Sequence, residues 1–327
     1  MTTFLSGRAA VRSAARFFAV ALLAISTQAF PKAFPDKDRP VRIVVPFGVG
    51  SGSDTVMRAY ARAVNEQTGI NVIVENKAGA EGSIGTEFVK NAAPDGYTVL
   101  FGNLSTHILN VYMLPKLSYD PVADFIPVTG ISNVALVLNA GPSTKIRTIG
   151  ELIEAARAEP GKLTFASGTT STRLSVEMFQ QMAHIKMLSV PYKTQSQAAV
   201  GLAGGEVDFL VTDVSTALPY FKNGRLRPLG TTGRTRLAAL PDVPTISEQG
   251  VENYEFSAWH ALFVPTGTPP DVVGELARIF RDAARSQYVA DALKANSCEG
   301  LDMDTEQLKA RIRADLDGWG TRLRAMK

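Results

Sequence analysis

Short apolar runs alternate with helix-like stretches along this chain, and this alternation constrains its fold more than any other feature. Alternating strands and helices are typical of a mostly parallel α/β architecture. The strand candidates are Val41–Pro46, Val72–Glu75, Thr98–Phe101, Ala135–Leu138, Leu163–Ser167, Val207–Val211 and Leu226–Thr231. We therefore predict an α/β fold.

Several intervening stretches carry helix signals. Thr148-Ile149-Gly150-Glu151 is a capping-box pattern that predicts a helix over Leu152–Ala158. Pro269 and Pro270 suit the first turn of a helix through Arg285. From Thr305 onward, spacings of four, four and three residues predict the apolar stripe of a docking helix, formed by Leu308, Ile312, Leu316 and Trp319.

The first 29 residues have the pattern of a secretory signal peptide. A basic stretch without acidic residues precedes the apolar run Phe17–Ile25 and the small residues around Thr27-Gln28-Ala29. A membrane anchor is the alternative, but this run is much shorter than the roughly 20 apolar residues that span a bilayer. We expect cleavage after Ala29 and export from the cytoplasm.

The formal net charge of the chain, +3, comes from this segment. The whole chain has 34 basic and 31 acidic residues, and the first 29 residues contain three arginines and no acidic residue. The mature chain is therefore formally neutral, without the basic excess that favours nucleic acid or a membrane surface. We expect no nucleic-acid partner.

Cysteine and histidine are scarce in this sequence. The chain has one cysteine, Cys298, and three histidines, His107, His184 and His260. A single cysteine cannot form an internal disulfide, and an exported chain of this size can bury enough core without one. These residues show no recognisable metal-ligand spacing. We expect neither a metal nor another cofactor.

The length of the chain favours two lobes. The mature region of about 298 residues exceeds one typical domain. Ser132–Ala140 and Asn253–Val264 are candidates for the strands that cross between the lobes. We expect residues 30–133 and 254–327 to form lobe 1 and residues 134–253 to form lobe 2. A cleft between two such lobes is a common place for a small ligand.

Three clusters of Gly, Ser and Thr stand where a strand is expected to lead into a helix. They are Gly48–Asp54, before a helix from about Thr55, then Ala78–Thr86 and Ser167–Thr172. The N–H groups that open a helix have no intrahelical partner and attract negative oxygens. These clusters are either ordinary turns and caps or a clamp for an anion such as a carboxylate. Their matching positions favour the clamp.

Individual side chains near these clusters have two interpretations each. Asp54 either caps its helix, which we favour, or accepts from a ligand ammonium, hydroxyl or water. Arg173 either pairs a second carboxylate or is a solvated surface residue. His107 either donates to the ligand or is a satisfied loop histidine. Phe47 and Trp259 either line the cleft or pack in the core.

The first glycine loop also imitates a dinucleotide site. However, a G-x-G-x-x-G motif would need glycine at Ser53 or at Thr55, so the third glycine is missing in both registers. No Gly-Lys-Ser/Thr follows, as a Walker loop requires. Val49–Ser53 does not fit the Gly-x-Ser-x-Gly of serine hydrolases. We therefore expect a binding protein rather than an enzyme.

Several further blocks follow one another along the chain. They are Arg39–Phe47 running into the glycine loop, Val74–Lys77, Ala93–Thr98, Tyr119–Pro121, Pro191–Lys193, Gly224–Arg227 and Leu240–Thr245. In these blocks the chain resembles the Bug-type solute-binding proteins of tripartite tricarboxylate transporters. The resemblance covers essentially the whole mature region.

The resemblance implies a two-lobed periplasmic binding protein (Venus-flytrap) fold, with a hinge between α/β lobes that close on a small carboxylate. It implies that Val49–Asp54 donate to one carboxylate, opposite Ser167–Thr172 and Asp213. Two departures from the family pattern are Ser51 in place of a second glycine and Arg173 near the place of a histidine. An arginine at the distal end of the ligand would favour a second negative group.

We predict a monomeric periplasmic protein that delivers a small carboxylate to the membrane permease of a tripartite transporter. The alternative is a periplasmic ligand-sensing subunit for a signalling partner. The residues expected to bind the ligand are Phe47, Val49, Gly50, Ser51, Gly52, Ser53, Asp54, Ser83, Ser105, Thr106, His107, Ser167, Thr169, Thr170, Ser171, Arg173 and Asp213.

Overall fold

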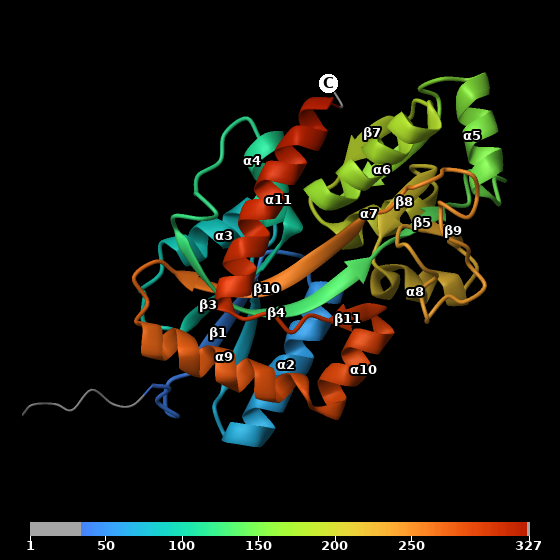
Figure 1. Ribbon diagram of the computed structural model, residues 1–327. Helices are drawn as coiled ribbons and strands as arrows, with labels where there is room; N and C mark the ends of the chain where they lie inside the picture. Colours follow the sequence, from blue (N-terminus) through green and yellow to red (C-terminus); the bar gives the residue numbers. More distant parts are fainter. Residues whose placement is uncertain (1–33, 326–327) are drawn as a thin grey trace, which may run out of the picture. The chain divides into compact units, whose positions relative to one another are not determined.

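The computed structural model describes residues 34–325, so the predicted signal peptide lies outside the described residues. By its internal contacts the chain from Lys37 onward is one compact unit. Within this unit the strands form two separate sheets, each flanked by helices (Figure 1). The chain therefore has two lobes, one built on each sheet.

The sheet of lobe 1 consists of β1 (Val41–Val45), β2 (Val72–Asn76), β3 (Thr98–Asn103), β4 (Phe125–Ala135), β10 (Ser257–Pro265) and β11 (Cys298–Gly300). Their order in space is β11-β4-β10-β3-β1-β2. β1 pairs in parallel with β2 and β3, whereas β10 pairs antiparallel with β3 and β4. β11 adds a short antiparallel edge beside β4.

The sheet of lobe 2 consists of β5 (Val137–Ala140), β6 (Thr164–Ser167), β7 (Leu188–Pro191), β8 (Phe209–Thr212) and β9 (Arg227–Thr231). Their order in space is β7-β6-β8-β5-β9. β6 pairs in parallel with β7 and β8, and β5 pairs antiparallel with β8 and β9. Both sheets are therefore mixed.

The prediction of a mostly parallel architecture needs correction for this reason. The parallel pairs belong to strands that are joined through helices, as predicted. Every antiparallel pair includes β4, β5 or β10, and between β4 and β5 the chain has a single residue, Leu136. A chain that passes directly from one sheet to the other has no crossover helix to return it in parallel.

The helices of lobe 1 are α2 (Gly52–Thr68), α3 (Ser83–Lys90), α4 (Asn110–Met113), α9 (Pro270–Ala284), α10 (Gln287–Ala295) and α11 (Thr305–Ala325), with a 3-10 turn η1 (Ala80–Gly82) and a π-helical turn η2 (Ser105–Leu109). Those of lobe 2 are α5 (Ile149–Ala158), α6 (Thr170–Ala183), α7 (Gln195–Gly204) and α8 (Val214–Lys222). In the described part of the chain, no helix is long and apolar enough to cross a membrane.

The helix signals predicted from the sequence are confirmed. The Thr148 hydroxyl accepts from the Glu151 N–H (3.1 Å), and Glu151 accepts from the Arg147 N–H (2.7 Å) at the start of α5. α9 begins at Pro270, as predicted. The apolar stripe of α11 packs into the core: Leu308, Ile312 and Trp319 are buried, and Leu316 is partly buried beside them.

Two segments cross between the lobes, and Thr232 connects them. Its hydroxyl accepts from the Leu136 N–H (2.7 Å) on the outgoing segment. The same hydroxyl donates to the Phe256 carbonyl (2.8 Å), and the Phe256 N–H donates to the Thr232 carbonyl (2.8 Å) on the returning segment. Both crossings lie where the sequence predicted them, but the lobe boundaries at 133/134 and 253/254 stay a prediction.

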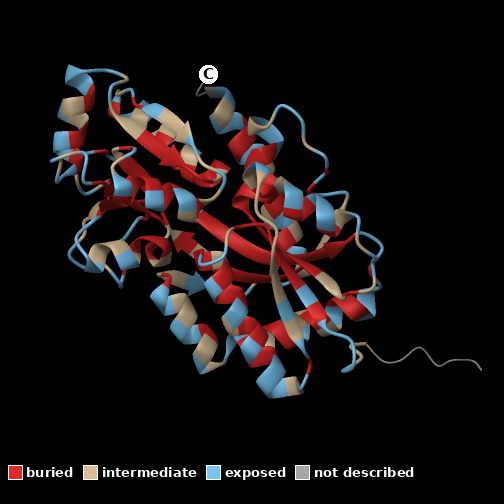
Figure 2. Cartoon of the chain, turned by 180° about the vertical axis from the view of Figure 1, so that it is seen from behind, coloured by how far each residue is buried: buried red, intermediate tan, exposed pale blue. Residues whose placement is uncertain are grey.

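The core of each lobe lies between its sheet and its helices. Figure 2 shows buried strands at the centre of the fold and helices that are buried along one side and exposed along the other. Trp259 is among the largest fully buried side chains, and its indole N–H donates to Asp315 (2.7 Å). Of its two sequence interpretations, the structure therefore supports core packing.

Candidate functional site

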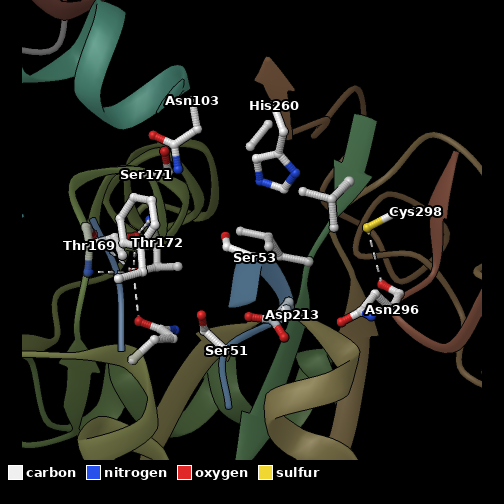
Figure 3. A pocket seen from close by; sticks show the side chains of 16 residues that line it. Ser51, Ser53, Asn103, Thr169, Ser171, Thr172, Asp213, His260, Asn296 and Cys298 are labelled. Atoms are coloured by element: carbon white, nitrogen blue, oxygen red, sulfur yellow. Dashed lines mark hydrogen bonds between the residues drawn. The ribbon is translucent and has the colours of Figure 1, made fainter. Parts of the chain in front are cut away.

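A cavity of about 70 Å³ lies between the two lobes (Figure 3). Lobe 1 lines it with Phe47, Ser51, Gly52, Ser53, Asn103, Val134, Ala258, His260, Asn296 and Cys298. Lobe 2 lines it with Thr169, Ser171, Thr172, Gln195 and Asp213, and Leu136 lies between the lobes. Most polar groups in this wall are hydroxyls and amides, which suit hydrogen bonding to a small polar ligand.

The first glycine loop reaches the cavity through the start of α2. Ser51 is the N-cap, because its hydroxyl accepts from the Asp54 N–H (3.3 Å). The helix therefore begins at Gly52, three residues before the predicted Thr55. The N–H groups of Gly52 and Ser53 are in the first turn and have no intrahelical acceptor. The loop thus presents backbone and hydroxyl donors, as the sequence suggested.

Asp54 is not the N-cap of α2, which corrects the role favoured from sequence. It lies in the first turn, where its carboxylate accepts the Gly50 N–H (3.0 Å) and forms an ion pair with Arg58 (2.9 Å). Only 3 % of Asp54 is exposed, and it does not line the cavity. A carboxylate in this place stabilises the positive end of the helix and holds the loop.

The start of α6 contributes most of the lobe 2 wall. Thr169 is the N-cap, and its hydroxyl accepts from the Thr172 N–H (3.3 Å). The Thr172 hydroxyl in turn donates to the Thr169 carbonyl (2.9 Å). No acidic side chain lies in this first turn. However, the carboxylate of Glu81 from lobe 1 accepts from the Thr170 hydroxyl (3.3 Å), so the positive end of α6 is compensated in part from outside the cavity wall.

The start of α8 has the opposite character. Asp213 is its N-cap and accepts from the Thr216 N–H (2.9 Å) and the Ser215 hydroxyl (2.6 Å) through Oδ1. Its Oδ2 accepts from the Thr216 hydroxyl (3.1 Å). Asp213 lines the cavity, as the family resemblance implied, but it brings a negative charge that compensates the helix end.

Direct hydrogen bonds join the lobes beside the cavity. The hydroxyls of Ser105 and Ser171 are 2.6 Å apart, and the Ser171 N–H donates to Ser105 (3.0 Å). The Thr170 hydroxyl donates to Oδ1 of Asn110 (2.6 Å). Ser105 and Thr170 are therefore behind the cavity wall, where they hold the lobes together rather than line the cavity.

His107 and Thr106 lie in the core of lobe 1. His107 is fully buried, stacks on Phe263 at 3.7 Å between ring centroids, and has Nδ1 3.0 Å from the Thr106 hydroxyl. Burial lowers the pKa of His107 to about 3, so the ring is neutral. Neither residue lines the cavity. His107 is thus a core histidine within η2, not the loop histidine considered from sequence.

The other predicted ligand-binding residues also lie away from the cavity. Val49 is the exposed tip of the first loop, and Ser83 opens α3. Ser167 is the buried last residue of β6. Arg173 has Nε 3.6 Å from Glu177 and lines a different groove with Tyr112 and Arg324. Nothing in its position brings it to the distal end of a ligand in the cavity.

Two residues that line the cavity from strands of lobe 1, His260 and Cys298, have shifted pKa values. Burial lowers the pKa of His260 to about 4, and its Nδ1 lies 2.9 Å from the Ser132 hydroxyl. Burial, with the negative charge of Asp213, raises the pKa of the Cys298 thiol to about 12. At neutral pH the cavity therefore contains a neutral imidazole and a neutral thiol.

Asn103, Gln195, His260, Asn296 and Cys298 line the cavity but were not predicted to do so. They come from five different parts of the chain, and none belongs to a glycine or hydroxyl cluster. For Asn103 a weak signal exists, because it lies between the predicted strand Thr98–Phe101 and the hydroxyls of Ser105 and Thr106. Asn296 and Cys298 carry no local signal, since they meet the cavity only through the packing of α10 and β11.

Among the described residues, no group of three His, Cys, Asp or Glu side chains is arranged to hold a metal ion. The arrangement is instead that of a small polar cavity between two hinged α/β lobes. Together with the sheet topology, this defines the class of the protein: a two-lobed periplasmic binding protein fold.

The comparisons with known proteins agree with this class. The structure of the periplasmic binding protein BugD is 28% identical with a TM-score of 0.83, over 88% of this chain and 98% of that chain. The structure described as R. palustris Rpa4515 with adipate is 28% identical with a TM-score of 0.85, over 90% and 98%. MatC from Rhodopseudomonas palustris with bound malate is 28% identical with a TM-score of 0.79, over 86% and 97%.

Residues 56–327 match the family model TctC, described as the tripartite tricarboxylate transporter family receptor. Protein BugT of Bordetella pertussis is 31% identical over 284 residues, which are 86% of this chain and 87% of that protein. A relative from Pseudomonas sp., the UPF0065 protein in the tcbD-tcbE intergenic region, is 34% identical over 88% of this chain and 85% of its own length. The chain therefore belongs to the tripartite tricarboxylate transporter receptor family.

Proposed function

We propose that the protein captures a small organic carboxylate in the cavity between its lobes and delivers it to the membrane permease of a tripartite transporter. The observation that carries this proposal is the first turn of α6. Thr169, Ser171 and Thr172 line the cavity there, and the first turn itself contains no acidic residue. Glu81 of lobe 1, which does not line the cavity, accepts from the Thr170 hydroxyl (3.3 Å) and compensates part of the positive helix end. The hydroxyls and the remaining helix-end dipole stabilise a carboxylate.

The comparisons support the ligand class. Two similar proteins of known structure are described with adipate and with malate, and both ligands are small organic carboxylates. The cavity of this chain has hydroxyl groups from both lobes: those of Ser51 and Ser53 at the start of α2, and that of Ser171 at the start of α6. A carboxylate oxygen accepts two or more hydrogen bonds, so one carboxylate can connect the two lobes.

Capture is proposed to work by closure of the lobes. The crossings that meet at Thr232 act as the hinge. The proposed lobe boundaries at 133/134 and 253/254 lie within three residues of the end of β4 and the start of β10. The closed form is stabilised by contacts such as Ser105–Ser171. A ligand that contacts both walls binds the closed form more tightly and shifts the population toward it. The permease then recognises the closed shape.

The proposal also covers cleavage of the signal peptide, the oligomeric state and the fate of the bound ligand. Residues 1–29 act as a cleavable signal, so the protein is exported to the periplasm with Phe30 as its first residue. The mature protein is a monomer that binds its ligand without converting it. Mass spectrometry of the exported protein tests the first statement, and size-exclusion chromatography with light scattering tests the second. Ligand recovered chemically changed after incubation would contradict the third.

The binding proposal is tested by a thermal-shift screen of ligand-stripped mature protein. The panel contains mono-, di- and tricarboxylates, acidic amino acids and NAD. A ligand at a hundred times its Kd adds about 2.7 kcal/mol of stability. At this chain length each kcal/mol raises the Tm by roughly 2 °C or somewhat less. We expect a shift with one class of carboxylate. No shift with any carboxylate, or a shift with NAD alone, would overturn the proposal.

Delivery needs a separate test. Uptake of the radiolabelled ligand identified in the screen is measured in cells with and without the gene for this chain. We expect uptake to depend on the gene and on a permease encoded nearby. Unchanged uptake, together with a lost transcriptional response to the ligand, would instead favour the sensing role.

A further inference from the structure

A second hollow lies between the lobes, and it is much larger than the cavity. Its volume is about 730 Å³, against about 70 Å³ for the cavity. Residues 233–238, which follow β9, form its lobe 2 wall, and parts of α10 and β11 form its lobe 1 wall. We call this hollow the hinge groove. The lobes are therefore closed over the cavity and apart over the groove.

The cavity and the hinge groove lie on opposite faces of the strands that cross between the lobes. Successive side chains of a strand point to opposite faces of its sheet. Ala135 of β4 is paired with Ser257 of β10, and both line the groove. The neighbouring pair, Val134 and Ala258, lines the cavity, and Val134 also borders the groove. The crossing strands thus separate the two hollows.

The hinge groove begins directly beside the proposed hinge. Thr232 joins Leu136 and Phe256 there by hydrogen bonds. The chain neighbour of each of these three residues lines the groove: Ala135, Gly233 and Ser257. Because the crossings lie between the two hollows, a rotation about them that widens the cavity narrows the groove. Opening of the lobes therefore brings the two walls of the groove together.

The walls of the hinge groove are not joined to each other in this structure. Among the described residues, no hydrogen bond or ion pair connects residues 233–238 with residues 287–300. Both walls also carry a small exposed side chain, that of Ala238 in lobe 2 and that of Ala290 on α10 in lobe 1. Small side chains on facing walls leave room for the walls to approach.

Resting on the proposed function, we propose that the hinge groove sets how far the lobes open, because its walls meet as the cavity widens. Ala238 and Ala290 are positioning residues, since they line the groove and not the cavity. A bulky group in the groove holds the lobes closed and thereby raises the affinity for the ligand. By linkage, a molecule in the groove and a ligand in the cavity strengthen each other's binding.

The test fills the groove from each wall in turn. Ala238→Trp and Ala290→Trp each place a large ring in it at an exposed position, and two variants on separate walls keep the test valid should one fail to fold. Small-angle X-ray scattering of the ligand-free mature protein is expected to give a smaller radius of gyration for both variants than for the wild type. This measurement needs no identified ligand.

Affinity provides the second readout. If the closed form is about a tenth of the ligand-free population, holding the lobes closed raises the affinity for every ligand about tenfold. Isothermal titration calorimetry with the carboxylate found in the thermal-shift screen measures this factor. A merely structural role of the two alanines would not tighten binding, because a damaged fold weakens it.

Matched controls are available in both lobes. Ala239 in lobe 2 and Ala284 at the end of α9 in lobe 1 are exposed alanines that line neither the groove nor the cavity. Ala239→Trp and Ala284→Trp should have the radius of gyration and the affinity of the wild type.

The outcomes separate this inference from the function on which it rests. If both groove variants keep the radius and the affinity of the wild type, or if both bind more weakly, the inference is overturned and carboxylate binding stands. If no carboxylate binds to any of the proteins, the proposed function fails. The scattering comparison between the groove variants and their controls then still decides whether the groove limits opening.

Discussion

Helices α6 and α8 both begin directly after a strand of the lobe 2 sheet, and residues from both starts line the cavity. A neutral hydroxyl, that of Thr169, caps α6, whereas the carboxylate of Asp213 caps α8. Each cap satisfies a backbone N–H, so each helix start is stable. A carboxylate lies at both helix starts, because Glu81 of lobe 1 accepts from the Thr170 hydroxyl (3.3 Å) in α6, but only Asp213 of the two lines the cavity.

This comparison shows that a helix start near a cleft is not by itself an anion site. α2 makes the same point in lobe 1, because Asp54 compensates its first turn and accepts the Gly50 N–H. The hydroxyls at the start of α6 are therefore the proposed place of the ligand carboxylate. Substitutions at the helix starts and around the cavity test this difference.

The largest effect is expected from giving α6 the kind of cap that α8 has. Thr169→Asp keeps a good N-cap but sets a negative charge where the ligand carboxylate is proposed to lie. Two like charges about 4 Å apart repel by about 4 kcal/mol at the effective dielectric of such sites. We expect calorimetry to find affinity for the identified carboxylate reduced at least about 100-fold.

The matched control for this change is Thr148→Asp at the start of α5. Thr148 is also a threonine N-cap, and its hydroxyl accepts from the Glu151 N–H (3.1 Å), but it does not line the cavity. The Thr148→Asp variant should bind the identified carboxylate with the affinity of the wild type. Equal losses of affinity in both variants would mean that the ligand carboxylate does not lie at the start of α6.

The next largest effect is expected at Gly52. Gly52→Val places a side chain against Asn296 and Asp213, both about 3 Å from the new Cβ. Overpacking of this kind costs about 1–3 kcal/mol. Opening of the lobes relieves only the clash with Asp213, because Gly52 and Asn296 both belong to lobe 1. We therefore expect a roughly 10- to 100-fold loss of affinity together with a lower Tm. Gly274→Ala is the control, since a Cβ at Gly274 meets no atom within 4 Å. Unchanged affinity in Gly52→Val would mean that the close approach of Gly52 to Asp213 is not part of closure.

A moderate effect is expected from the protonation of His260. Burial lowers its pKa to about 4 from 6.5, so between these values the unfolded chain binds more protons than the folded one. Stability is therefore lost as the pH falls, by about 1 kcal/mol for one such histidine between pH 6.5 and 5.5. His107, with a pKa of about 3, contributes in the same direction.

Urea unfolding at the two pH values checks this expectation. Between pH 6.5 and 5.5, His260→Gln should lose about 1 kcal/mol less of its free energy of unfolding than the wild type loses. Carboxylates that titrate in the same range are common to both proteins, so their contribution cancels. An identical pH dependence would mean that folding leaves the pKa of His260 unchanged, so that its imidazole becomes protonated as the pH falls below 6.5. The cavity would then gain a cation in this pH range, and the contrast between the two helix starts would weaken.

The smallest effect is expected from the contacts between the lobes. Ser105→Ala removes the hydrogen bonds to the Ser171 hydroxyl and N–H. A net loss of about 0.5–1.5 kcal/mol corresponds to a roughly 2- to 12-fold lower affinity. Because the change acts on closure, it should weaken every ligand by the same factor. The control, Ser143→Ala, affects a bond to Asp208 within lobe 2. A factor that varies between ligands would instead place Ser105 at the ligand.

Much of the local architecture was predictable. The strand β1, the cap of α5, the start of α9 and the stripe of α11 depend on residues close together in sequence. The hydroxyl cluster before α6 was also identified correctly as facing the cleft. The start of α2 was misjudged because Asp54 and Ser51 are both good caps, and only the observed hydrogen bond assigns Ser51.

The cavity itself was only partly predictable. Phe47, Asp213 and six residues of the first and third clusters reach it. Val49, Gly50, Asp54, Ser167 and Thr170 of the same clusters do not, and neither do His107 and Arg173. A histidine or arginine next to a strand end can turn into the core or out to solvent, and the sequence does not encode which. Asn103 and Asn296 were missed because nearly 200 residues separate them, and their amides belong to no motif.

The sequence by itself determined the alternation of strands and helices, the helix caps and the family to which this protein belongs. These features rest on hydrogen bonds and apolar spacings among near neighbours, or on ordered blocks along the chain. The tertiary structure alone decided which caps face the cavity and which way each asparagine points. Those properties depend on partners from distant segments: the Ala292 carbonyl orients Asn296, and packing of the lobes sets it beside Asp213.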